Sequence, residues 1–358
     1  MKVLNWLLLF VPIAIALKFL APERYLLIFL AASLAILPLA GWMGRATEQL
    51  AERMGEGVGG LLNATFGNAA ELIIALAALR AGLHDVVKAS IIGSIVGNIL
   101  LVLGAAMLAG GLRHHEQHYN PAGARSQATM LTLAAIVLVL PAAFQIAAGS
   151  TPEGLGRLSV SISVVLLLVY LMYLIFTLVT HASLFAGSHA PEEGDGHAPP
   201  WSVGRSALVL AAATAAVAWI SEILVGAIEP TGHELGLSNV FVGVFVVAVL
   251  GNAAEHATAI TVALKNRMDL SLSIAMGSSV QVALFVAPLL VEVSLFLGPV
   301  PMDLAFPAGL VLIVLLSVLI TSQVAGDGRS DWLKGLQLLA VYLVLGLTYF
   351  FLPSVAAH

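Results

Sequence analysis

The amino-acid sequence predicts an all-α integral membrane protein with eleven transmembrane helices, arranged as one leading helix and two five-helix repeats of inverted topology. Three observations carry this prediction. Of the 358 residues, 60% are hydrophobic and 10% are charged, whereas a soluble domain carries about 25% charged residues. Apolar stretches long enough to cross a bilayer recur along the chain. A motif in the first half also returns in the second half at a constant offset.

The composition excludes several classes of function. The net charge of −5 leaves no basic stripe that could neutralise the phosphates of a nucleic acid. The chain has no cysteine, which excludes disulfides, thiol catalysis and cysteine-ligated zinc.

Eleven apolar stretches define the expected helices. They run over 4–20, 25–43, 58–79, 88–110, 126–148, 158–185, 205–228, 239–264, 270–297, 303–322 and 332–352. The first stretch is kept as a helix because no small-residue cleavage site precedes a soluble domain. The segment 187–200 is rich in acids, Gly and Pro and divides the chain. The expected parts are a leading helix in 1–24, a first repeat in 25–186, an acidic cytoplasmic linker in 187–204 and a second repeat in 205–358.

Basic residues set the expected orientation, because Lys and Arg near a span resist translocation. One side of the eleven-span topology holds ten of them: Lys2, Arg45, Arg53, Arg113, Arg125, Arg205, Lys265, Arg267, Arg329 and Lys334. The other side holds five: Lys18, Arg24, Arg80, Lys88 and Arg157. This bias favours a cytoplasmic N-terminus.

An internal repeat appears when the chain is compared with itself at an offset of 184 positions. The pentapeptide GNAAE of 67–71 recurs at 251–255, and the pair Gly93-Ser94 recurs as Gly277-Ser278. With five spans in each repeat, the second copy must enter the membrane upside down relative to the first. Inverted repeats of this kind are typical of secondary transporters, whose binding site lies near the bilayer midplane.

Each repeat carries one carboxylate and one amide within an apolar span. Glu71 and Glu255 are expensive to bury in lipid, and such residues are usually retained for a pathway or a partner. Asn68 and Asn252 lie three positions earlier, on the same helical face. We therefore expect Glu71, Glu255, Asn68 and Asn252 to bind a metal ion, with the two glutamates exchanging it for protons. A structural ion pair for the glutamates, and a capping role for the asparagines, are the alternatives.

The span that follows each motif is rich in hydroxyl and amide side chains. Ser94, Asn98, Ser278 and Gln281 are expected to line the pathway, or else to hydrogen-bond between helices. Glycines beside them suggest that these spans are interrupted. His256 points about 100° away from Glu255 and is either a hydrogen-bonding residue or a proton relay. Glu48 and Glu222 are candidates for a cytoplasmic vestibule.

These groups predict the transported ions. Carboxylates, amides, hydroxyls and carbonyls form a hard oxygen cage that suits a calcium-like ion, whereas magnesium prefers to keep its waters. Two like charges in a low-dielectric site disfavour double ionisation, so an empty pair is expected to hold protons. A divalent cation and protons would then exclude each other, which gives exchange.

The motifs resemble those of a known family, the cation/proton exchangers of the calcium/cation antiporter superfamily. The matching segments are 59–71 (GGLLNATFGNAAE), 90–94 (SIIGS) with Asn98, 251–256 (GNAAEH) with 265–269 (KNRMD), and 277–281 (GSSVQ) with Pro288. The resemblance covers all eleven expected spans. It implies a calcium/proton antiporter with a leading helix and two inverted repeats, in which Glu71 and Glu255 are the exchanging carboxylates.

Other functions were weighed against this one. A sodium-coupled calcium exchanger of the same superfamily is the nearest alternative. An intramembrane hydrolase is disfavoured, because the chain has no HExxH or GxSxG motif and no paired aspartates in its spans. We expect no enzyme activity, no cofactor, calcium and protons as transported ions, and a location in a prokaryotic cell (inner) membrane. A homo-oligomer is left open.

Overall fold

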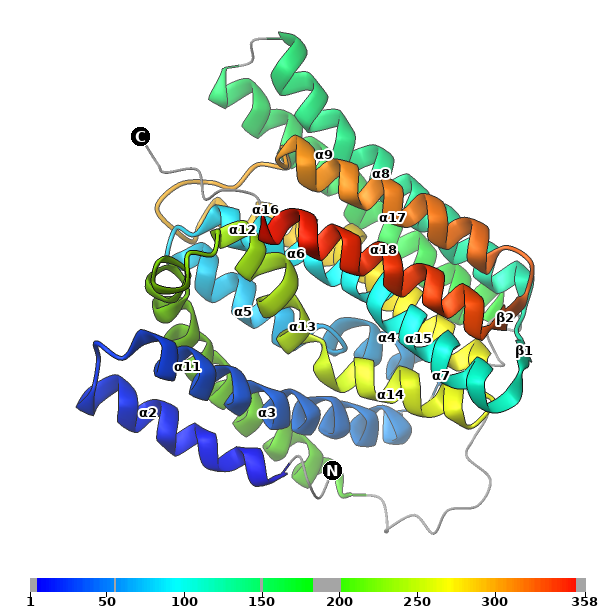
Figure 1. Cartoon of the computed structure of the whole chain (residues 1–358), viewed down its shortest axis with the longest axis horizontal. Coiled ribbons are helices and arrows are strands. Elements are labelled where there is room, and N and C mark those ends of the chain that lie inside the picture. The colour runs from blue at the N-terminus through cyan, green and yellow to red at the C-terminus, as the bar shows by residue number, and fades with distance from the viewer. Residues whose placement is uncertain (1–4, 55, 149–150, 183–200, 352–358) are drawn as a thin grey trace.

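The computed structural model describes residues 5–54, 56–148, 151–182 and 201–351. Helix dominates both halves (Figure 1). The first half contains η1 (Leu7–Leu9), α2 (Phe10–Leu20), α3 (Tyr25–Met54), α4 (Glu56–Phe66), α5 (Ala69–Arg80), α6 (His84–Val96), η2 (Gly97–Val102), α7 (Leu103–His114), β1 (Glu116–His118), α8 (Pro121–Ala148), α9 (Pro152–Ile175) and η3 (Phe176–Thr180). Of the linker expected in 187–204, residues 187–200 lie outside the described residues.

The second half repeats this helical character. It contains α11 (Val203–Leu235), α12 (Asn239–Phe241), η5 (Val242–Val247), α13 (Ala248–Gly251), α14 (Ala253–Leu264), α15 (Met268–Gln281), η6 (Val282–Val286), α16 (Ala287–Ser294), α17 (Ala308–Ala325), β2 (Arg329–Asp331) and α18 (Trp332–Phe350). The segments η2, η3, η5 and η6 are π-helical turns within longer helices. Helix thus occupies all or most of each of the eleven expected ranges.

Fewer than eleven helices are long enough to cross a bilayer on their own. Within the described residues, eight helices are long and apolar enough, and the bent pair Asn239–Gly251 and Ala253–Leu264 makes a ninth. The helix Leu7–Leu20 is shorter, and α4 and α5 have 11 and 12 residues. The chain is therefore an all-helical protein with several apolar spans, and the count of eleven crossings stays a prediction.

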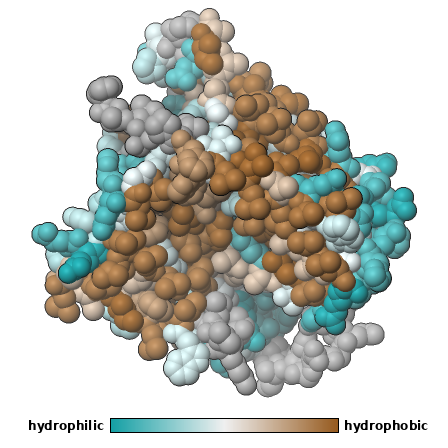
Figure 2. Space-filling model, viewed as in Figure 1, coloured by the Kyte–Doolittle hydropathy of each residue, from teal (hydrophilic) through white to brown (hydrophobic). Residues whose placement is uncertain are grey.

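The surface agrees with an environment of lipid. Hydrophobic side chains cover the middle of the face shown in Figure 2, and hydrophilic side chains gather toward its two ends. The helices of 27 to 33 residues are about 40 to 50 Å long. They therefore extend past a hydrocarbon core of about 30 Å at both ends.

Two helices that begin the expected repeats, α3 and α11, pack along each other in opposite directions (Figure 1). Near the end of α3, Gln49 Oε1 accepts a hydrogen bond of 2.8 Å from the backbone N–H of Trp201, just before α11 begins. The Trp201 ring stacks on Trp42 at a centroid distance of 5.9 Å. The C-terminal part of α3 therefore lies beside the N-terminal part of α11.

The continuous helices His84–His114 and Met268–Ser294, which begin with α6 and α15, lie in the centre of the molecule, and 83% and 78% of their most apolar stretches are buried. Glycine permits α6 to cross η5 closely. A Cβ atom at Gly243 would lie 2.6 Å from the Ala89 Cβ, and one at Gly93 would overlap the Val244 backbone. Gly93 thus serves close helix packing.

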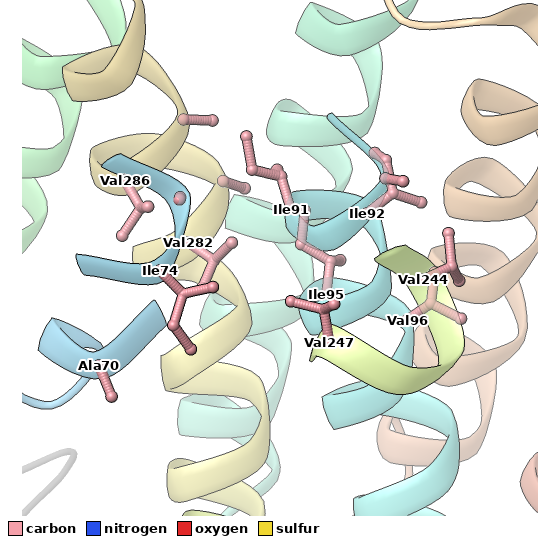
Figure 3. Close-up of a cluster of buried hydrophobic side chains, with 14 of the residues drawn as sticks. Ala70, Ile74, Ile91, Ile92, Ile95, Val96, Val244, Val247, Val282 and Val286 are labelled. Atoms are coloured by element: carbon pink, nitrogen blue, oxygen red, sulfur yellow. The ribbon is translucent and has the colours of Figure 1, made fainter. Parts of the chain in front are cut away.

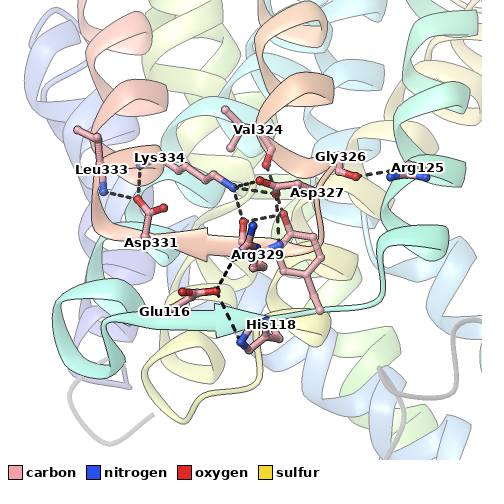
Figure 4. A network of polar contacts seen from close by, with 11 residues as sticks. Glu116, His118, Arg125, Val324, Gly326, Asp327, Arg329, Asp331, Leu333 and Lys334 are labelled. Atoms are coloured by element: carbon pink, nitrogen blue, oxygen red, sulfur yellow. Dashed lines mark hydrogen bonds and ion pairs between the residues drawn. The ribbon is translucent and has the colours of Figure 1, made fainter.

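A short antiparallel sheet ties two connections together at one end of the bundle (Figure 4). Glu116 pairs with Asp331, Gln117 with Ser330 and His118 with Arg329. Beneath the sheet, Gln117 Nε2 donates a hydrogen bond of 2.8 Å to the Ala263 carbonyl near the end of α14. The sheet therefore anchors the end of the helix that begins beside Glu255.

Candidate ion-binding site

The site is built around two helix breaks, at Asn68 between α4 and α5 and at Asn252 between α13 and α14. Asn68 has φ −100° and ψ 27°, and Asn252 has φ −94° and ψ 3°. These angles lie near the sparsely allowed bridge region, which interrupts a helix. The chain bends by 62° at Asn252. Glu71 and Glu255 each lie in the first turn after the break.

The position of the breaks corrects one expectation from the sequence. Interruptions were expected in the spans that carry Ser94 and Ser278. There the chain instead stays helical from His84 to His114 and from Met268 to Ser294, with π-helical turns at η2 and η6. The glycines of these spans did not need to break the helix, because Gly93 is used for close packing against Val244.

Each glutamate lies against the break in the other repeat. A Cβ atom built at Gly251 would be 3.0 Å from Glu71 Cγ and 3.7 Å from its Oε1. A Cβ atom at Gly67 would be 3.6 Å from Glu255 Oε1. Gly67 and Gly251 are equivalent under the 184-residue offset, so the two contacts mirror each other. The absence of a side chain at each glycine lets the carboxylate of the opposite repeat approach the break.

Each asparagine also forms a hydrogen bond with a serine of the other repeat. Ser278 Oγ donates a hydrogen bond of 2.8 Å to Asn68 Oδ1. Asn252 Nδ2 donates one of 3.0 Å to Ser94 Oγ. Both asparagines are in N-cap position, but neither side chain makes a capping hydrogen bond. Both side chains therefore join the two repeats, and Asn252 Nδ2 also donates a hydrogen bond of 2.9 Å to the Ala248 carbonyl of α13, which ends at the break.

Four polar atoms in this region are buried and have no hydrogen-bond partner among the described residues: Glu71 Oε2, Glu255 Oε2, Asn68 Nδ2 and Asn252 Oδ1. Buried polar atoms in native proteins are nearly always satisfied, so each exception calls for an explanation. Here the exceptions fall on two pairs of residues related by the repeat. An ion, a proton or water is the simplest missing partner.

The charged groups near Glu71 and Glu255 also favour an ion-binding site. Glu71 lies within electrostatic range of Glu255. None of the salt bridges found in the described parts of the chain involves either glutamate. The alternative of a structural ion pair with Arg or Lys therefore finds no support.

Asn98 and His256 extend the polar network on one side only. Asn98 Nδ2 donates a hydrogen bond of 3.1 Å to Ser278 Oγ, and Asn98 Oδ1 lies 3.1 Å from His256 Nε2. The equivalent positions in the other repeat are Val282 and Leu72, which cannot form such bonds. His256 is thus a hydrogen-bonding residue, as the first of its two interpretations predicted.

Gln281 also belongs to only one half of the site. Its Oε1 would lie 3.7 Å from a Cβ atom at Gly67, next to Glu255. The equivalent residue is Gly97, where an added Cβ atom would meet nothing within 4 Å. Of the residues expected to line the pathway, Ser94, Asn98, Ser278, Gln281 and His256 are therefore all brought together at the site.

A cavity of about 320 Å³, including its open mouth, reaches Glu71. Ser90, Ser94 and Gly251 contribute its polar and backbone lining. Apolar side chains from α5, α6, η5 and η6 form the remainder, and Figure 3 shows them: Ile74, Ile91, Val247, Val282 and Val286. Apart from Glu71, the only side chains of this lining that offer an oxygen to a cation are Ser90 and Ser94.

Glu48 and Glu222 do not share a vestibule, which corrects the expectation from the sequence. Glu48 is next to Gln49, at the end of α3 beside Trp201. Glu222 lies 21 residues after Trp201, roughly 30 Å along α11. There Glu222 forms an ion pair of 2.9 Å with Arg80 at the end of α5. Because α3 and α11 are antiparallel, the two acids lie at opposite ends of the pair.

Sequence reasoning missed the role of Gly67 and Gly251 as contact points for the glutamates. Their recurrence in the GNAAE motif was the available signal. No cluster of three or more His, Cys, Asp or Glu side chains that could hold a metal occurs in the described part of the chain. A bound cation would therefore have two carboxylates and otherwise neutral oxygens as ligands.

Comparison with known proteins identifies the family. The model of the sodium/calcium exchanger protein family matches residues 24–179 and 205–351. The chain is 46% identical to a Ca(2+)/H(+) antiporter of Synechocystis sp., covering 99% of this chain and 98% of that protein. It is 43% identical to the Ca(2+)/H(+) antiporter ChaA of Bacillus subtilis, over 88% and 90% of the two chains.

The fold has been seen in a solved structure. The native structure of YfkE has a TM-score of 0.84 and 38% sequence identity, and the match covers 98% of this chain and 100% of that one. The resemblance to cation/proton exchangers is thereby confirmed. The chain belongs to the sodium/calcium exchanger protein family.

Proposed function

We propose that the protein exchanges calcium for protons across a membrane, and that Glu71 and Glu255 bind either the cation or the protons. The relatives named as Ca(2+)/H(+) antiporters support the pair of transported ions. The observation that carries the site assignment is the set of buried atoms on Glu71, Glu255, Asn68 and Asn252, at the two equivalent helix breaks, that have no hydrogen-bond partner within the part of the chain that the structure describes.

The chemistry follows from the charges. Two carboxylates close together in a buried site repel each other, so the ion-free pair takes up protons. A calcium ion supplies two positive charges and prefers oxygen ligands, and it therefore displaces those protons. Either occupant leaves the site near neutrality, which lowers the cost of moving the loaded site between the two sides of the membrane.

We further propose an inverted-repeat architecture, with a leading helix in 1–24, repeats in 25–186 and 205–358, and a linker in 187–204. The reciprocal bonds Asn68–Ser278 and Asn252–Ser94 support this division. Alternating access would come from movement of α3 and α11 along the core that contains the breaks. We place the protein in the cell membrane with a cytoplasmic N-terminus, on the basis of its basic residues.

Proteoliposomes with an imposed pH gradient test the function. We expect calcium-45 uptake that depends on the gradient and does not require sodium. Glu71→Gln and Glu255→Gln should each abolish uptake, because an amide cannot exchange a proton. Glu153→Gln is the matched control, since Glu153 is exposed and pairs only locally with Arg157.

Sodium distinguishes the alternative within the family. Uptake that ignores the pH gradient but follows a sodium gradient would favour a sodium-coupled calcium exchanger. Full proton-coupled uptake by either glutamine variant would refute the assignment of the two glutamates.

A further inference from the structure

The helices α2, α3 and α11 lie together along one side of the molecule (Figure 1). Besides the stacked rings of Trp42 and Trp201, the guanidinium of Arg205 in α11 lies 4.7 Å from the centre of the Trp201 ring. The Trp42 indole N–H also donates a hydrogen bond of 3.2 Å to Asn5 Oδ1, ahead of α2. These contacts tie the three helices to one another, and we call α2, α3 and α11 the three-helix unit.

Arg80 is the last residue of α5, and the turn that follows it is held by the connection between α16 and α17. A Cβ atom at Gly82 would lie 2.9 Å from Pro299 Cγ. One at Gly298 would lie 2.7 Å from the carbonyl oxygen of Leu79. Both glycines have positive φ, 78° and 97°, which other residues adopt only with strain. Arg80 therefore stands on a fixed part of the core that contains the helix breaks.

An ion pair joins this end of α5 to the three-helix unit. Arg80 Nη1 lies 2.9 Å from Glu222 Oε1 of α11. The two side chains are 66% and 53% exposed, so water can replace either partner and the pair is weak enough to open repeatedly. A shift of α11 along the core by one helical turn, about 5.4 Å, would separate the two charges beyond the range of an ion pair.

The equivalent positions in the inverted arrangement cannot form this pair. Under the 184-residue offset, Leu264 corresponds to Arg80 and Pro38 corresponds to Glu222. Leucine and proline carry no charge. When the three-helix unit moves to its other position, the ion pair is therefore lost, and no equivalent pair forms between these two positions. The Arg80–Glu222 pair thus favours the arrangement described here over the other one.

We infer that the Arg80–Glu222 ion pair is a one-sided latch between the core and the three-helix unit, closed in the arrangement described here and opened in each exchange cycle. This inference rests on the proposed function, because it requires α3 and α11 to move along the core. Arg80 lies nine residues after Glu71, about 13 Å along α5. The latch therefore sets which arrangement is populated and does not bind the transported ion.

A cleavable cross-link tests whether the latch opens. The chain has no cysteine, so Arg80→Cys/Glu222→Cys carries only the two new thiols. In proteoliposomes, this double variant is treated with a short bis-methanethiosulfonate, which a reducing agent removes again. We expect the linked protein to lose its proton-driven calcium-45 uptake and to regain it on reduction. Linked protein that keeps the uptake of the unlinked protein would overturn the inference, and so would two thiols that the reagent does not join.

Glu153→Cys/Arg157→Cys is the matched control. This pair also joins a glutamate to an arginine, at 2.6 Å, but within one helix, α9. The same reagent should link it without loss of uptake.

Calorimetric titration with calcium separates a trapped protein from a damaged one. The protein linked between positions 80 and 222 should still bind calcium, because the link lies away from the ion site, and loss of binding would contradict the latch. Wild-type protein without proton-driven uptake contradicts the proposed function. Normal uptake by the linked protein contradicts the latch alone.

Electron paramagnetic resonance tests the contribution of the charges. Spin labels on Ala81→Cys in the core and Ala218→Cys in α11, both at exposed positions, report the distance between the two parts. Arg80→Gln should raise the ratio of the open to the closed arrangement by about two- to fivefold, the range of an exposed ion pair. The exchanged pair Arg80→Glu/Glu222→Arg should restore the original ratio. Equal ratios with and without the two charges would refute the latch.

Discussion

Gly251→Ala is the substitution whose effect can be worked out most directly from the structure. The new Cβ atom would lie 3.0 Å from Glu71 Cγ and 3.6 Å from its Cδ, whereas carbon atoms in contact are about 3.5 to 4.0 Å apart. The Glu71 side chain must therefore move by about 0.5 Å or more. Calcium–oxygen distances vary only over about 2.3 to 2.6 Å. The displacement thus exceeds the tolerance of the site.

The expected result is a roughly tenfold loss of kcat/KM for proton-driven calcium-45 uptake, since a misplacement of about 1 Å costs about a hundredfold. The variant should fold normally, because alanine favours the helix of α13 and only the Glu71 side chain has to give way. Gly97→Ala is the matched control, as its Cβ atom meets nothing within 4 Å. Wild-type kinetics for Gly251→Ala would refute the contact between Glu71 and the opposite break.

Two further predictions concern the ends of the bundle. Lys88 Nζ donates a hydrogen bond of 2.7 Å to Asp303 Oδ1, and the two side chains are 11% and 35% exposed. Asp303→Asn should therefore lower the free energy of unfolding by about 2 kcal/mol, which is less than the cost for a fully buried pair because water reaches Asp303. A thermal-shift assay checks this, and an unchanged unfolding temperature would contradict it. Partial burial raises the pKa of the Asp327 carboxyl, but hydrogen bonds from Lys334 and from the backbone of Arg329 outweigh it and leave that pKa below its ordinary value (Figure 4). The stabilisation is therefore present at neutral pH and is lost as the pH falls through the lowered folded-state pKa. The hydrogen-exchange protection factors of residues 326–334, which are corrected for the intrinsic exchange rate, should therefore fall in acid, and Asp327→Asn should lower them already at neutral pH.

The sequence predicted the elements that depend on composition and on repetition. Hydropathy located the helices because a segment that faces lipid, such as the C-terminal two thirds of α9, must be mostly apolar. The GNAAE repeat located the site, since only Glu71 and Glu255 combine a buried charge with an exact counterpart in the other half. The residues that gather there, from Asn68 to Gln281, were identified because polar side chains are costly within apolar spans.

Other features depend on contacts that a hydropathy pattern does not contain. The helix breaks occur at Asn68 and Asn252, where the backbone angles leave the helical region. The prediction that placed them beside the later glycines was therefore wrong. The ion pair between Arg80 and Glu222 joins residues 142 positions apart, and no local signal gives that pairing. The hydrogen bonds that join Asn98, Ser278 and Asn68 likewise connect residues of different repeats, and no local signal gives them.

The most direct test of the central claim is proton release on calcium binding. Purified protein in a weakly buffered solution is titrated with calcium while a pH-sensitive dye reports free protons. The account predicts that calcium expels protons from the wild-type protein, and that the double variant Glu71→Gln/Glu255→Gln releases none. Calcium that binds tightly to the wild-type protein without releasing protons would contradict the claim that both ions compete for the same two carboxylates.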